Sequence, residues 1–229
     1  MPPAQRRLWP ELRPSLALGF VLYGGTAVSL HLGHRRSADF DFFQDRPLDR
    51  ERIRAAFPAI RDATVLQEGP DTLVVAARAG GAGRQGIKLS FFGGLTFGRI
   101  GDPLITEDGV LEVASLDDLL AHKLEVILQR VERKDYQDVA AMIRVGGSVA
   151  RGLAAARTFF GRAFQPLESL KALTYFEGGD LDRLSRLDRK TLTDAAAAVD
   201  TLPKAVLRSR KLAIPFPTGR PGAARRRPR

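Results

Sequence analysis

Residues 23–43, YGGTAVSLHLGHRRSADFDFF, decide the fold that we predict for this chain. In this stretch a pair of glycines opens a short helical run, a basic loop follows, and two aspartates then alternate with phenylalanines. The alternation Asp39-Phe40-Asp41-Phe42 has the period of two of a β-strand, which places both rings on one face and both carboxylates on the other. We therefore expect the rings to enter a core while the carboxylates point to one spot.

The spacing of Asp39 and Asp41 suits a divalent cation. Alternate residues of a strand have Cα atoms roughly 6.5–7 Å apart, which lets two carboxylates share one or two cations. Like charges held this close are costly without a cation. A solvated strand face explains the pair equally well when it is taken alone.

The glycine pair adds an anion-binding feature just upstream. Residues 18–23 are apolar and predict a strand, and the residues after the glycines have mostly helical spacing. Glycines let the backbone approach phosphate oxygens, and free N–H groups at a helix start favour an anion. We expect Gly24, Gly25 and Thr26 to cradle phosphates, although a tight strand-to-helix turn would also explain them. A phosphate cradle followed by a metal pair outlines a triphosphate site.

Composition and charge bound the class of protein. The 229 residues hold 36 Lys and Arg against 26 Asp and Glu, and the resulting net charge of +10 favours nucleic acid as a partner. The absence of cysteine excludes disulfide and thiolate chemistry, and three histidines argue against a His-rich zinc site. No apolar run approaches the ~20 residues of a membrane span and no signal peptide is visible, so we expect a cytoplasmic protein.

Short runs of apolar and β-branched residues predict the rest of the sheet. They lie at residues 64–67, 72–78, 87–92 and 110–113, with a glycine-rich hairpin turn at 80–86. Helical periodicity dominates from residue 115 onward. We therefore predict an α+β protein. Its parts are a mixed-sheet domain over 1–114, a helical region over 115–215 and a basic disordered tail over 216–229.

The first helix of that region carries a lysine in its apolar stripe. Lys123 falls between Leu119 and Ile127, whereas His122 falls on the polar side of the same helix. A lysine in such a stripe must extend its charge to the rim or meet an anion, and the sequence leaves both open. On the next helix, Asp135 and Asp138 lie one turn apart beside Arg133 and Lys134. These four are either capping and ion-pairing residues or the rim of an active site.

Taken together, these motifs resemble the nucleotidyltransferase toxins of the AbiEii/AbiGii type, within the DNA polymerase β-like superfamily. The resemblance covers about residues 15–145. It rests on Gly-Gly-Thr-Ala, on Gly-His-Arg-Arg-Ser-x-Asp-Phe-Asp-Phe-Phe, and on the stretches at 121–124 and 132–139. It implies a polymerase β-like domain that transfers a nucleoside monophosphate from a triphosphate to an acceptor hydroxyl. Asp39 and Asp41 would hold Mg²⁺ or Mn²⁺.

The resemblance also implies roles for the surrounding residues. Lys123 would neutralise the triphosphate, and Asp138, with Asp135 as second choice, would pair with Lys123 or activate the acceptor. Arg35 or Arg36, together with Ser37, would bind phosphate or the acceptor backbone. One departure from the family pattern stands on the strand at 87–92, where Ser90 takes the place of a third carboxylate.

The resemblance and the positive charge make RNA, and the tRNA 3′ end in particular, the expected acceptor. The protein would then be the toxin of a toxin–antitoxin system, with a cognate antitoxin as partner. Two alternatives remain open at this point. One is transfer of the nucleotide to a protein hydroxyl, and the other is a catalytically silent nucleotide- or RNA-binding module.

Overall fold

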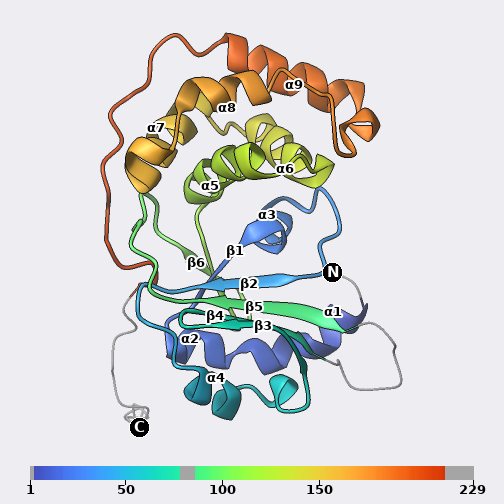
Figure 1. Ribbon diagram of the computed structural model, residues 1–229, viewed down its shortest axis with the longest axis vertical. Coiled ribbons are helices and arrows are strands. Elements are labelled where there is room, and N and C mark those ends of the chain that lie inside the picture. The colour runs from blue at the N-terminus through green and yellow to red at the C-terminus, as the bar shows by residue number, and fades with distance from the viewer. Residues whose placement is uncertain (1–2, 78–85, 215–229) are drawn as a thin grey trace, which may run out of the picture.

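A single mixed sheet, sandwiched between helices, organises the molecule (Figure 1). The computed structural model describes residues 3–77 and 86–214, and within them the sheet has seven strands in the order β3-β4-β5-β2-β1-β7-β6. The helices α1, α2 and α4 lie on one side of the sheet, and α3, α5 and α6 lie on the other, beneath an outer layer of α7, α8 and α9. The predicted α+β class is confirmed.

The strands bear out most of the predicted positions. They are β1 Val21–Tyr23, β2 Phe40–Phe43, β3 Thr64–Gly69, β4 Thr72–Ala77, β5 Ile87–Phe92, β6 Leu104–Ile105 and β7 Glu112–Val113. The central strand β2 runs antiparallel to β1 and parallel to β5. The strand predicted over 18–23 is shorter than expected, because α2 extends to Leu18 and the left-handed Gly19 (φ 73°) turns the chain before β1 begins.

The helices begin largely where capping residues predict. They are α1 Pro3–Leu8, α2 Pro14–Leu18, α3 Gly24–Leu32, α4 Arg50–Ala56, α5 Leu116–Gln129, α6 Arg133–Arg144, α7 Val149–Phe160, α8 Pro166–Ala172 and α9 Arg186–Ala197. Asp49 caps α4 by accepting a hydrogen bond from the Arg52 backbone N–H at 2.9 Å. Ser115 and Ser148 cap α5 and α7 in the same way. Each such cap satisfies an N–H that the helix itself leaves without a partner.

The rings of β2 anchor the core on the α4 side of the sheet. Phe40 and Phe42 are fully buried, and Phe42 stacks on Phe91 of β5 with ring centroids 5.2 Å apart. Phe57, just after α4, meets Phe91 edge-on at 5.2 Å. Because side chains alternate along a strand, Asp41 points to the opposite face, toward α3 and α5. The predicted alternation of rings and carboxylates is confirmed for β2.

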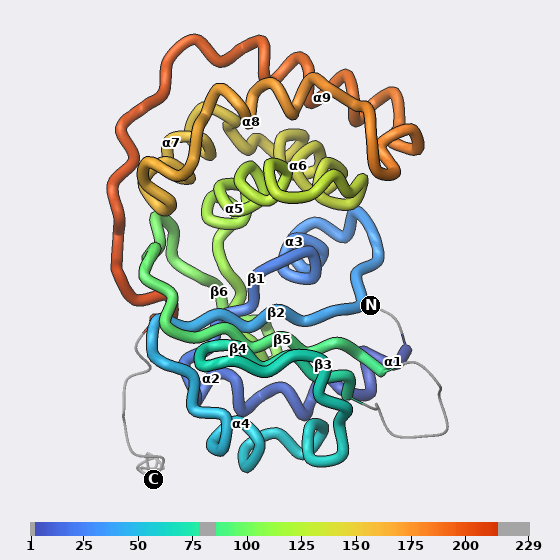
Figure 2. Tube along the Cα trace, in the orientation of Figure 1, coloured from blue at the N-terminus to red at the C-terminus, as the bar shows by residue number. Residues whose placement is uncertain are grey.

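The chain after α9 returns to the sheet instead of continuing as a helix (Figure 2). The backbone N–H of Leu212 donates to Asp45 Oδ1 at 3.3 Å, and that of Ile214 donates to Glu112 Oε1 at 2.7 Å. A helical region was expected up to residue 215, but α9 ends at Ala197, and Pro203 disfavours a new helical turn soon after it. The predicted tail at 216–229 and most of the turn at 80–86 lie outside the described residues.

One continuous buried core joins the sheet to the helices that follow it. The strands all precede residue 114 and the helices α5–α9 all follow it. The division of the chain into a domain at 1–114 and a helical region from 115 therefore remains our proposal about chain order.

The returning segment supplies a test of this packing. Leu212 is fully buried, whereas Val206 in the same segment is 66% exposed. We expect Leu212→Ala to lower the free energy of unfolding by about 2–5 kcal/mol, because it empties a buried site. Val206→Ala should change it by less than about 0.5 kcal/mol. Urea denaturation of both variants measures the difference, and equal small effects would show that the segment does not pack on the sheet.

Candidate active site

A cleft lies between the sheet and α5, with a volume of about 210 Å³. The sheet and the start of α3 form one wall, and α5 with the residue after it forms the other. The lining residues are Tyr23, Gly24, Gly25, Asp41, Phe43 and Phe92 on the first wall, and Leu119, His122, Lys123, Val126, Gln129 and Arg130 on the second. The predicted phosphate cradle, one predicted metal ligand and the predicted lysine thus share one cleft.

Gly24 and Asp41 are held against each other by the register of the sheet. Tyr23 of β1 is paired with Asp41 of β2, so the first residue of α3 directly follows the strand position beside the carboxylate. Gly24 has φ +73°, and a Cβ at this position would lie 2.2 Å from Asp41 Oδ2. Only glycine permits this approach. The helix start, which favours an anion, therefore lies next to the carboxylate.

The two predicted metal ligands have different surroundings. Asp41 lines the cleft, and burial raises the pKa of its carboxyl, although a hydrogen bond with Ser90 and the charge of Lys88 oppose the rise. Asp39 lies one residue before β2, is 44% exposed, and pairs with Lys88 Nζ at 3.2 Å. Lys88 was not predicted. Ser90 is the register partner of Asp41 on β5, so it does stand beside one of the two predicted metal ligands.

Asp39 and Asp41 supply the donor type that a substrate-completed magnesium site uses, although only Asp41 lines the cleft. Over residues 3–77 and 86–214, no cluster of three or more His, Cys, Asp or Glu side chains is arranged to hold a metal ion alone. Mg²⁺ is usually bound by one or two carboxylates, with water and substrate phosphates as its remaining ligands. Burial is the main cause of the raised pKa of Asp41, and the charge of Asp39 contributes less to it.

Asp138 lies at the centre of a buried charge cluster. Its carboxylate accepts hydrogen bonds from Arg35 Nε at 2.5 Å and Nη2 at 2.7 Å, and it contacts His34 Nε2 at 2.7 Å. Lys123 Nζ lies 2.7 Å from its other oxygen. Burial would raise the pKa of Asp138, but the hydrogen bonds from His34 and Arg35 and the charge of Lys123 outweigh burial and hold it well below the ordinary value.

Asp135 extends the same cluster toward the cleft. Lys123 Nζ donates to Asp135 Oδ1 at 2.6 Å, and Arg130 Nε donates to Asp135 Oδ2 at 2.8 Å. Lys123 thus lies between two fully buried carboxylates while its side chain also lines the cleft. Of the two interpretations of this lysine, the structure supports the one in which it meets an anion.

The loop between α3 and β2 uses several predicted phosphate-binding residues for its own structure. The Thr26 hydroxyl is buried and lies within hydrogen-bonding distance of Ser37 Oγ (2.9 Å) and of the Asp39 carbonyl. The guanidinium of Arg35 is engaged by Asp138, as described above, whereas Arg36 is exposed. The hydrogen bonds of Thr26, Ser37 and Arg35 therefore hold the loop between α3 and β2 in position.

The two predicted basic residues at the start of α6 do not line the cleft and form ion pairs instead. Arg133 contacts Asp180, with its backbone N–H 2.7 Å from Asp180 Oδ1. Lys134 Nζ pairs with Glu132 Oε2 at 2.6 Å near the start of α6. The side chains of Arg133 and Lys134 are both substantially exposed. For Arg133 and Lys134, the structure therefore supports an ion-pairing role over a place at the rim of the active site.

His122 is the residue that the sequence placed wrongly. The helical pattern put it on the polar side of α5, but its ring lies 4.5 Å from Phe97, 5.0 Å from Tyr23 and 5.3 Å from Phe160. The outer helix α7 covers this face, which no pattern within α5 reveals. Burial lowers the pKa of His122 to about 3, so the ring is neutral at physiological pH.

Comparison with known proteins identifies the family. The family model for the nucleotidyl transferase AbiEii toxin of type IV toxin–antitoxin systems matches residues 7–206. The chain belongs to the AbiEii family. It is therefore a nucleotidyltransferase, and of the toxin type, as the sequence motifs predicted.

The chain is also similar to individual proteins in sequence or in fold. An uncharacterized protein of Aquifex aeolicus (strain VF5) is 32% identical over 152 residues, which cover 62% of this chain and 70% of that protein. The fold is similar to that of MenT4, nucleotidyltransferase toxin Rv2826c from Mycobacterium tuberculosis H37Rv. That comparison has a TM-score of 0.59 and 15% identity over 86% of this chain and 82% of that one. An antigenic nucleotidyltransferase-like protein from Paracoccidioides brasiliensis gives a TM-score of 0.53 and 18% identity, over 86% of this chain and 94% of that one.

The close approach at Gly24 can be tested with a matched glycine of this AbiEii protein. Gly24 and Gly109 both have positive φ (73° and 65°), but a Cβ at Gly109 would meet nothing within 4 Å. Gly109→Ala should cost about 1–2 kcal/mol of stability through backbone strain alone. Gly24→Ala should cost more and should also abolish nucleotide transfer, because the methyl group displaces Asp41. Denaturation and a transfer assay measure both effects, and equal behaviour of the variants would refute the contact.

The buried state of His122 predicts a pH dependence of stability. Because its folded pKa of about 3 lies below the ordinary value of 6.5, the unfolded chain binds the proton first as pH falls. As the pH falls from 6.5 to 3, His122 should therefore reduce the free energy of unfolding by about 1.4 kcal/mol per pH unit. Urea denaturation at pH 7.5 and 5.0 tests this. His122→Phe should show a shallower pH slope than the wild type, and an unchanged slope would contradict burial.

Proposed function

We propose that this AbiEii family member transfers a nucleoside monophosphate from a triphosphate to an acceptor hydroxyl within the cleft between the sheet and α5, in a metal-dependent reaction. The observation that carries the proposal is the meeting of three features in one cleft: the Asp41 carboxylate, the helix start at Gly24, and Lys123 on the facing wall. The reaction releases pyrophosphate as the acceptor oxygen displaces it from the α-phosphorus.

The start of α3 would bind the triphosphate. Gly24 and Gly25 leave the backbone open to phosphate oxygens, and the N–H groups of the first turn and the helix dipole favour negative charge. A Cβ at Gly25 would lie 2.4 Å from Arg35 Nη2, so a guanidinium already borders this cradle. Lys123 adds positive charge from the facing wall, and the exposed Arg36 lies in the loop beside the cradle.

Asp39 and Asp41 would hold a divalent cation, for which we propose Mg²⁺, with Mn²⁺ as a substitute. When bound there, such an ion would supply stabilisation of the negative charge that develops during transfer. Lys88 neutralises Asp39 in the structure, and a cation would take over this role. The raised pKa of Asp41 means that its carboxyl must lose any proton before it can act as a ligand.

Asp138 is better suited to positioning than to removing a proton. Both of its oxygens are engaged by Arg35, His34 and Lys123, and its lowered pKa makes it a weak base. We therefore assign to Asp138 and Asp135 the role of fixing Lys123. Ser90 provides no carboxylate, so activation of the acceptor would fall to the cation and its aspartate ligands.

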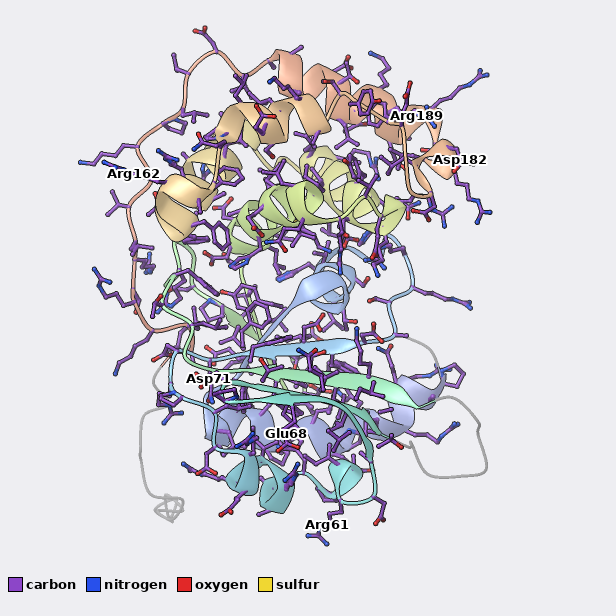
Figure 3. The ribbon with its side chains drawn as sticks, viewed as in Figure 1. Arg61, Glu68, Asp71, Arg162, Asp182 and Arg189 are labelled. Atoms are coloured by element: carbon purple, nitrogen blue, oxygen red, sulfur yellow. The ribbon has the colours of Figure 1, made fainter. Side chains whose placement is uncertain are left out.

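We propose RNA, and specifically a tRNA 3′ end, as the acceptor. The support is the net charge of +10 together with exposed arginines on the outer helical layer, where Figure 3 shows Arg162 projecting from the molecule. Cationic side chains attract a phosphate backbone without sequence preference. Membership of a toxin–antitoxin family supports a cognate antitoxin as the second partner.

We place the reaction in the cytoplasm, where nucleoside triphosphates and tRNA are found. Among the helices that the structure describes, none combines the length and the apolar character that crossing a bilayer demands.

A labelling experiment tests the proposed reaction. The protein is incubated with RNA, Mg²⁺ and each α-labelled triphosphate, and RNA 3′ ends are sequenced. We expect Asp41→Asn and Asp39→Asn to reduce labelling by at least about 100-fold, since each removes a ligand of the cation. Asp117→Asn is the matched control, because Asp117 pairs with Arg151 at an exposed site on α5. It should label as the wild type does.

The same experiment distinguishes the acceptors. Label that is lost with RNase and retained with protease supports RNA, whereas the reverse would establish a protein acceptor. Labelling that survives both aspartate substitutions, or that continues after chelation of divalent cations, would overturn the metal assignment.

A further inference from the structure

We propose that Arg130 binds the phosphate chain of the nucleotide from the helical wall of the cleft, and that Asp135 positions its guanidinium for this role. The inference rests on the nucleotidyl transfer proposed above and assigns a further phosphate-binding residue to that reaction. Arg130 directly follows the last residue of α5, in an extended backbone conformation.

The guanidinium of Arg130 reaches from the protein interior to the cleft. Its Nε donates to Asp135 Oδ2 at 2.8 Å, and its Nη2 donates to Asp135 Oδ1 at 3.2 Å. The Asp135 side chain is fully buried, whereas 47% of the Arg130 side chain is exposed and lines the cleft. The two bonds occupy one edge of the guanidinium and fix its plane. Over residues 3–77 and 86–214 its Nη1 has no hydrogen-bond partner, so these N–H groups can donate to a ligand.

The charge of Arg130 acts on the same part of the cleft as that of Lys123. Lys123 Nζ donates to Asp135 Oδ1 at 2.6 Å, so the two cations meet at one carboxylate oxygen. The hydrogen bond to Asp135 is the main cause of the raised pKa of Arg130, and the charge of Asp41 on the sheet wall adds to the rise. The two cations are therefore held side by side, on the wall that faces Asp41 and the start of α3.

The cluster behind this wall carries more positive than negative charge. Its three cationic side chains and two buried carboxylates are those of Arg35, Lys123, Arg130, Asp135 and Asp138. Glu132 adds little to this balance, because its Oε1 lies 3.9 Å from Arg130 Nε at the exposed surface and its Oε2 pairs with Lys134 at 2.6 Å. Surplus positive charge that borders a cleft beside a helix start favours an anionic ligand.

An arginine held in this way suits a phosphate chain. The planar guanidinium can donate to a carboxylate from one edge and to phosphate oxygens from the other, which an ammonium cannot do. The alternative is a purely structural role, since Arg130 joins the end of α5 to the first turn of α6 and a helix C-terminus favours a cation. That role explains the bonds to Asp135 but gives no function to the guanidinium edge exposed in the cleft.

Calorimetry on the full-length protein separates the two roles. The probe is inorganic tripolyphosphate with Mg²⁺, which presents the phosphate chain without a base, and the free energy of unfolding of each variant is measured beside its affinity. Arg130→Gln should weaken tripolyphosphate binding by about tenfold or more, because hydrogen bonds to a charged group are lost. Arg130→Lys should recover only part of this affinity, because an ammonium cannot serve Asp135 and a phosphate from separate edges.

Arg133→Gln is the matched control. Arg133 lies close to Arg130 in the chain and is partly exposed, but it pairs with Asp180 and does not line the cleft. Its replacement should change the affinity for tripolyphosphate by less than about twofold. If Arg130→Gln does not fold, Arg130→Lys decides by itself. An affinity about threefold or more below that of the wild type supports the inference, and an affinity equal to that of the wild type overturns it.

Several other results would overturn the inference. These are a wild type that does not bind tripolyphosphate, an Arg130→Gln variant that loses stability but keeps the affinity, and an equal loss of affinity in Arg133→Gln. A raised KM for RNA with unchanged tripolyphosphate affinity would place the guanidinium against the acceptor and would also overturn it.

The labelling assay keeps this failure apart from failure of the proposed function. Labelling by a wild type whose affinity for tripolyphosphate does not depend on Arg130 refutes the phosphate-binding role alone. Tripolyphosphate binding that depends on Arg130, without any labelling of an acceptor, refutes the proposed reaction and leaves the phosphate site standing.

Discussion

The buried cluster around Lys123 holds the two walls of the cleft in place. Arg35 reaches from the loop after α3, Lys123 from α5, and Asp135 and Asp138 from α6. Removing one member of a buried ion pair typically costs about 3–5 kcal/mol, because the remaining charge has no partner. The cluster is thus a strong constraint on how the loop and the two helices meet. It adds to the continuous apolar core that joins the sheet to the helices.

The cluster also determines how charge is distributed over the cleft. The sheet contributes the acidic residue Asp41, with Asp39 just before β2, and α5 contributes the cation Lys123 on the opposite wall. The first N–H groups of α3 enter between them, next to Gly24. A triphosphate that brings a cation can satisfy all three at once, since its oxygens suit the lysine and the helix start while the cation suits the carboxylates. This complementarity explains why one cleft gathers groups of both signs.

The motifs within single elements could be predicted from the sequence, but contacts between distant elements could not. The alternation in β2, the glycines before α3 and the serine cap of α5 depend on neighbours in the chain, and each appears as predicted. The partner of Arg35 lies on α6, and nothing in the loop sequence favours a carboxylate over a phosphate there. His122 was misplaced because α7 covers a face of α5 that the helical pattern alone assigns to solvent.

The position of a cation with bound triphosphate tests the central claim most directly. Crystals grown with Mn²⁺ and a non-hydrolysable triphosphate analogue reveal the metal by its anomalous scattering. The account predicts a peak in contact with the carboxylates of Asp39 and Asp41, with phosphate oxygens against the backbone of Gly24 and Gly25. Phosphates bound outside this cleft, or a metal peak that touches neither aspartate, would contradict it.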